Sequence, residues 1–136
     1  MPEKLLSEKY ALEFSQTDRY ERQEKLAYFK EMTEVMSPAE LASTTVDFIR
    51  ANNRTQMRGD TDPESKQAIA EALAICRDTS LEQCVAARKI NDHTAGNDYE
   101  TIFEAARFEY ELMTDCNFHP VTVPISCDKI YELALK

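Results

Sequence analysis

The chain has 136 residues, of which 43% are hydrophobic and 30% are charged, and this balance excludes an intrinsically disordered protein. A chain of this length can remove roughly two-thirds of its unfolded surface from water, so it can bury a core without metal ions or disulfide bonds. The net charge of −9 argues against a general nucleic-acid-binding surface. We therefore expect one soluble domain over residues 1–136.

Glycine scarcity favours helices over strands. The chain contains two glycines, Gly59 and Gly96, whereas sheet proteins of this size normally need more of them for hairpin turns. Residues 1–10 carry four charges and lack the apolar run of a signal peptide, and no stretch approaches the roughly eighteen apolar residues of a membrane span. We expect an all-α protein of the cytoplasm with reduced cysteines.

Helix starts are marked by short polar residues that stand three positions before a glutamate, a spacing at which both side chains can cap free backbone amides. Pro38 and Pro63 add a second signal, because proline suits the first helical position. The polar–glutamate pairs are Asp18 with Glu21, Ser37 with Glu40, Thr79 with Glu82, and Asn97 with Glu100. Together with apolar periodicity, they predict a compact bundle of six or seven helices, at about residues 3–15, 18–36, 38–58, 63–77, 80–91, 98–115 and 127–135.

One segment near the C-terminus does not follow the helical pattern. Pro120 and Pro124 bracket residues 121–123, and the residue before a proline is driven away from the helical conformation. We expect residues 118–125 to form an extended connection that packs on the bundle.

Negative charge is concentrated in residues 96–115, which contain six acidic residues and one basic residue and so hold more than half of the net charge. At 100° per residue, four of the acids line up beside the main apolar face of the predicted helix. These acids are Glu100, Glu104, Glu111 and Asp115. A second apolar strip follows on the far side of the acids, and it consists of Ala105, Phe108 and Leu112.

A surface helix needs a single apolar face, so the second strip indicates a further contact, with another helix or with a partner. We expect a non-enzymatic interaction module, a regulator or inhibitor that binds a basic, nucleic-acid-handling protein through the acidic side. The expected binding residues are Glu100, Glu104, Phe108, Glu111, Leu112 and Asp115. We expect no cofactor, no direct nucleic-acid contact and no membrane contact. The alternatives are a merely solvated face and a homodimer formed through the second strip.

Arginines at positions 50, 54 and 58 share one face if the helix 38–58 is continuous. Arginine near a helix C-terminus is stabilised by the helix dipole, so we expect local stabilisation or pairing with the acidic helix. A phosphate or nucleic-acid contact is the alternative.

Enzyme chemistry has one candidate region. Cys116, His119 and Cys127 carry good zinc-ligand groups, and Cys116 with His93 is a conceivable nucleophile–base pair. A metal-binding or thiol-dependent enzyme is therefore the alternative function. Glycine loops for phosphate and helical glutamate–histidine metal motifs are absent from the sequence.

Overall fold

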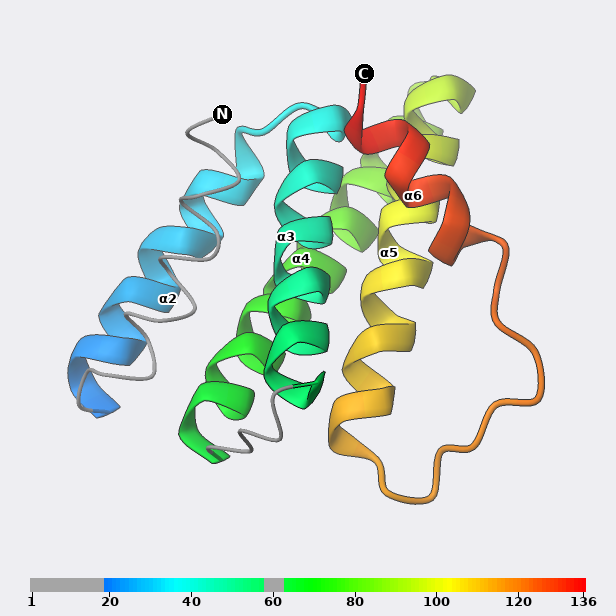
Figure 1. Cartoon of the computed structure of the whole chain (residues 1–136). Coiled ribbons are helices and arrows are strands. Elements are labelled where there is room, and N and C mark those ends of the chain that lie inside the picture. The colour runs from blue at the N-terminus through cyan, green and yellow to red at the C-terminus, as the bar shows by residue number, and fades with distance from the viewer. Residues whose placement is uncertain (1–18, 58–62) are drawn as a thin grey trace.

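The computed structural model describes residues 19–57 and 63–136, and within these ranges it contains five helices and no strand (Figure 1). The helices are α2 (Arg19–Glu34), α3 (Pro38–Met57), α4 (Pro63–Lys89), α5 (His93–Thr114) and α6 (Ser126–Ala134). The all-α class and the helical bundle are confirmed. The expected helix at residues 3–15 lies outside the described residues. Among the described helices, none combines the length and the apolar content needed to cross a membrane.

The centre of the bundle is built by α3, α4 and α5. The long helices α4 and α5 run antiparallel and pack on each other more extensively than any other described pair, and α3 packs on both (Figure 1). On one side α2 lies against α4, and the short α6, in red, crosses one end of the bundle and contacts α3 and α5.

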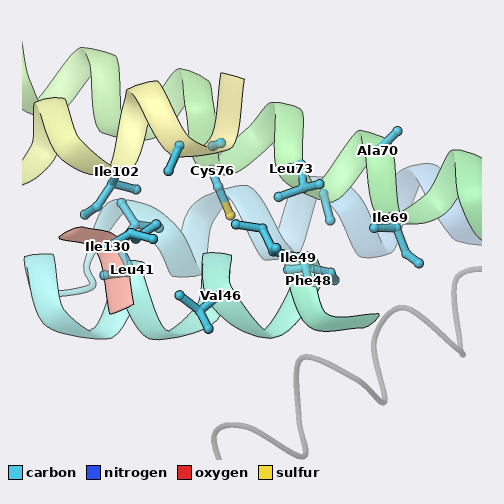
Figure 2. Close-up of a cluster of buried hydrophobic side chains, with 14 of the residues drawn as sticks. Leu41, Val46, Phe48, Ile49, Ile69, Ala70, Leu73, Cys76, Ile102 and Ile130 are labelled. Atoms are coloured by element: carbon cyan, nitrogen blue, oxygen red, sulfur yellow. The ribbon is translucent and has the colours of Figure 1, made fainter. Parts of the chain in front are cut away.

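The core lies where α3, α4, α5 and α6 meet, and Figure 2 shows its central side chains. Leu41 and Phe48 of α3, Leu73 of α4, Ile102 of α5 and Ile130 of α6 are completely buried. Burial of each such side chain stabilises the fold by about 1.5–3 kcal/mol relative to leaving it in water. These contacts position α5, the helix that carries the acidic residues.

Two contacts attach α2 to the bundle. The ring of Phe29 meets the ring of Phe48 edge to face, with 5.5 Å between centroids. One turn further along α2, the hydroxyls of Thr33 and Thr79 form a buried hydrogen bond of 2.8 Å. An apolar and a polar contact thus fix α2 against both α3 and α4.

The start of α3 confirms the capping signal read from the sequence. The Ser37 hydroxyl accepts a hydrogen bond of 3.2 Å from the Glu40 amide and donates one of the same length to the Glu40 carboxylate. The helix begins at Pro38, directly after this cap.

The expected boundary between helices 63–77 and 80–91 is wrong, because both belong to the single helix α4. Thr79 does not cap a helix; it is buried and bonds to Thr33. Ser80 is buried as well, and its hydroxyl donates to the Cys76 carbonyl of the preceding turn at 2.7 Å. The expected count of six or seven helices is therefore not supported.

The turn from α4 to α5 lies at residues 90–92, and α5 begins at residue 93 rather than at the expected residue 98. Asn91 adopts a left-handed φ of 61°, and the Asp92 amide donates to the Ala87 carbonyl, which together close α4 in a Schellman motif. The Asp92 carboxylate then caps α5 by accepting from the Ala95 amide at 3.1 Å. Asn97, the expected cap, lies within the helix.

Gly96 also lies within α5, at its approach to α4. A Cβ atom at this position would come within 3.2 Å of Cγ of Arg88, and the Gly96 carbonyl accepts from the Cys84 thiol at 3.3 Å. Glycine therefore permits a close helix–helix contact here instead of ending a helix.

The connection between α5 and α6 contains neither helix nor strand. It bulges outward from the bundle (Figure 1). Val121 is fully exposed, and Val123 and Ile125 are mostly exposed. Phe118, at the start of the expected segment, packs its ring on Phe108 of α5, but packing of the rest of this connection on the bundle is not confirmed.

Candidate interaction surface

The acidic residues lie along one continuous helix. Helix α5 runs unbroken through His93–Thr114 and ends with Asp115 as its C-cap. At 100° per residue the four acids fall within a sector of about 60°, and at 1.5 Å per residue they extend over about 22 Å. We define the acidic row as Glu100, Glu104, Glu111 and Asp115.

Two carboxylates of the acidic row pair with arginines of this chain. Glu100 lies 2.7 Å from the guanidinium of Arg88 on α4, and Glu111 lies 3.8 Å from that of Arg107. All four side chains remain substantially exposed, so water and salt screen both pairs and each contributes little to stability. The arginines offset part of the row's charge, and the surface is less negative than the sequence suggests.

The other two carboxylates of the row have neutral partners. Glu104, which is partly buried, accepts a hydrogen bond from the Ser126 hydroxyl at the start of α6. Asp115 is exposed and accepts from the Asn117 amide at 2.9 Å. These contacts orient the carboxylates without offsetting their negative charge.

Internal contacts account for most of the second apolar strip. Ala105 is buried, and the ring of Phe108 meets that of Phe118 edge to face at a centroid distance of 5.6 Å. Leu112, in contrast, stays 43% exposed. Leu112 is thus the member of the strip that is most available to a partner.

Sequence patterns did not reveal the partners that Glu100 and Glu104 have on other helices. Arg88 is 12 positions from Glu100, and Ser126 is 22 positions from Glu104. Helical periodicity relates residues three or four positions apart, so neither contact leaves a local signal.

Of the arginines at positions 50, 54 and 58, Arg58 lies outside the described residues. Arg50 places its guanidinium 5.6 Å from the ring centre of Tyr131 on α6. A cation–π contact of this kind stabilises the packing of α6 on α3 by about 0.5–1 kcal/mol when exposed. This contact gives Arg50 a structural role.

The region of the alternative enzyme function does not form a metal site in the part of the chain that the structure describes. There, no group of three or more histidine, cysteine, aspartate or glutamate side chains is placed to hold an ion. Cys116 and His119 are exposed on the connection, whereas Cys127 is half-buried on α6. Burial, reinforced by the nearby carboxylate of Glu109, raises the pKa of Cys127 to about 11. Its thiol is thus a weak nucleophile at neutral pH.

Thiol reactivity should follow this burial pattern. The measurement uses native protein at pH 7.5–8, which is about one unit or less below the pKa of a free thiol. Under these conditions 5,5′-dithiobis(2-nitrobenzoate) should modify Cys116 at least roughly tenfold faster than Cys76 or Cys127. Cys76 is completely buried, which raises its pKa to about 12. The Cys116→Ser variant should lose the fast phase. A fast phase that persists in this variant would point to a second activated thiol.

Glu109 is a partly buried acid that the sequence did not single out. Burial raises the pKa of its carboxyl group, and a hydrogen bond from Asn52 of α3 opposes this shift only in part. The pKa of such a carboxyl group is higher in the folded state than in the unfolded state. The group contributes its full stabilisation when the pH lies below the unfolded-state pKa, and this contribution is lost as the pH rises through the folded-state pKa. The fold therefore loses this contribution of Glu109 as the pH rises toward neutrality.

Replacing Glu109 by Gln should therefore stabilise the protein at pH 7. The amide keeps the shape and can still accept from Asn52, but it carries no charge to desolvate. Urea unfolding of both proteins at pH 7 and below about pH 4 measures the difference, which should shrink at the lower pH. A variant less stable than wild type at pH 7 would contradict this account.

Comparisons with protein-family models, curated proteins and solved structures find no match. The function must therefore be inferred from the described surface.

Proposed function

We propose that this protein is a non-enzymatic interaction module that regulates or inhibits a partner with a basic surface, which it binds through the outer side of α5. The observation that carries the proposal is the acidic row, whose four carboxylates share one side of a continuous helix and are each held by a contact within the chain. Side chains that are already oriented lose less entropy on binding.

The two ends of the acidic row differ in what they offer a partner. Glu100 at the N-terminal end is balanced by Arg88, whereas Asp115 at the C-terminal end has a neutral partner. Leu112, which is partly exposed, adds an apolar contact near Asp115. We therefore place the centre of the proposed interface over the last two turns of α5.

The test reverses the charge of two carboxylates of the acidic row that the fold does not require. The double variant Glu111→Lys/Asp115→Lys should lose at least about tenfold in capture of the partner from host lysate, since opposite charges steer and hold the complex. A basic residue at the end of a helix is compatible with the helix dipole, so the variant should keep its helical circular dichroism. Glu104 is left intact because it binds Ser126 of α6.

A matched control makes the same charge change elsewhere. Glu31 of α2 and Glu132 of α6 are exposed, and the variant Glu31→Lys/Glu132→Lys should capture the partner like wild type. Capture should also weaken between about 50 and 300 mM salt, because screening acts on exposed charges. Equal capture by the two double variants would refute the proposed role of the acidic row.

A further inference from the structure

The connection between α5 and α6 exposes both apolar side chains and unpaired backbone groups. Val121 is fully exposed, and Val123 is 59% exposed. In the described part of the chain, no hydrogen bond engages the backbone amides or carbonyls of residues 121–123. The chain bends at Val121 and Thr122, so it does not form a straight strand here. Apolar side chains beside free backbone groups favour association with another extended chain.

The same segment is complementary to a second copy of itself. Val121, Thr122 and Val123 are β-branched and favour an extended backbone, on which the two valines point to the same side. When two copies lie antiparallel about a two-fold axis at Thr122, Val121 of each copy faces Val123 of the other. Pro120 and Pro124 have no amide hydrogen, so this pairing stops at the prolines and does not spread along the chain.

The connection is longer than the docking of α6 on its own bundle requires. Phe118 packs on Phe108, and Ser126 donates to Glu104, so the two ends are held at α5 positions about 6 Å apart along the helix axis. The residues between these ends, 119–125, reach about 23 Å when they are fully extended. Straightening the bend therefore moves α6 off its own bundle and gives it the length to reach a neighbouring one.

The site that holds α6 accepts the same helix from another copy. Ile130 is completely buried there, Ser126 donates to Glu104 of α5, and the Tyr131 ring lies 5.6 Å from the Arg50 guanidinium of α3. None of these contacts involves the connection, so they form equally well when α6 comes from a second chain. An exchange of α6 therefore preserves the docking contacts, and pairing of the two connections adds a further contact.

We propose that two copies of this chain exchange α6, so that each α6 docks on α3 and α5 of the other copy and the two connections pair through Val121 and Val123. This inference goes beyond the proposed function and does not depend on the acidic row. Monomer and dimer share the α6 contacts, so the dimer gains only the pairing of the connections and is weak. The protein concentration during folding thus decides between the two forms.

Refolding from urea at two protein concentrations tests the exchange. Light scattering after size-exclusion chromatography should show monomer after refolding at about 5 µM and a dimer fraction after refolding at about 0.5 mM. Monomer alone at the higher concentration would overturn the proposal.

Cross-linking distinguishes exchange of α6 from other modes of dimerisation. Lys129 of α6 and Asp98 of α5 line one groove, so a carbodiimide can join this amine to this carboxylate. In dimer refolded from equal amounts of ¹⁴N- and ¹⁵N-labelled protein, about half of the Lys129–Asp98 peptides should combine one light and one heavy chain, since the copies associate at random. A dimer in which each such peptide is wholly light or wholly heavy has not exchanged α6 and contradicts the proposal.

The variant Val121→Asn/Val123→Asn tests the pairing of the connections. It should weaken the dimer by at least about tenfold, because asparagine removes the apolar contact and disfavours an extended strand. The monomer should keep its stability, since both valines are exposed. In the matched control Val35→Asn/Leu135→Asn, both substituted residues are more than 80% exposed and lie outside the connection, so the control should dimerise like wild type. Equal dimerisation by the two double variants would overturn the pairing.

Discussion

Replacing Ser80 by proline should destabilise the protein by about 3 kcal/mol or more, because proline inside a helix removes a backbone hydrogen bond and its ring clashes with the preceding turn. Position 80 lies in the middle of α4, and its hydroxyl also donates to the Cys76 carbonyl. The sequence alone predicts the opposite result. A helix that began at residue 80 would accept proline there without cost.

The Ser80→Ala variant separates the backbone effect from loss of the hydroxyl. Alanine keeps the helix and leaves no donor unsatisfied, so its stability should stay within about 1 kcal/mol of wild type. Urea unfolding followed by circular dichroism measures both variants. If Ser80→Pro is as stable as Ser80→Ala, α4 is interrupted near this residue.

The substitution Phe48→Ala should cost about 3–5 kcal/mol, because it removes a completely buried ring and leaves a cavity between α2 and α3. The Phe29 ring would also lose its edge-to-face contact. The midpoint of urea unfolding should fall accordingly. The lost free energy is a large part of the total stability of a domain this size.

An exposed aliphatic residue provides the control for this loss. Val121 is fully exposed, so Val121→Ala should change the stability by less than about 0.5 kcal/mol. A cost below about 1 kcal/mol for Phe48→Ala would mean that α2 does not pack on α3 as described.

The sequence predicted the helical class and the cap of α3 because both depend on short-range patterns. The pairs Ser37 with Glu40 and Thr79 with Glu82 have the same spacing, yet only the first caps a helix. The difference lies in the partner of Thr79, which is Thr33, 46 positions away. From the sequence alone, a threonine that hydrogen-bonds to another helix cannot be distinguished from a threonine that caps its own helix.

The acidic row was predictable for a similar reason, and its environment was not. Periodicity alone placed Glu100, Glu104 and the other acids on one side of α5. The offsetting charge of Arg88 and the anchoring of Glu104 by Ser126 come from other helices.

The short turn at residues 90–92 has a consequence for how the chain folds. It joins the two helices that pack most extensively, so the largest helix–helix contact forms between residues that are near neighbours along the chain. Closing such a short loop costs little entropy. We expect the α4–α5 hairpin to nucleate folding and α6, which follows a long connection, to dock late.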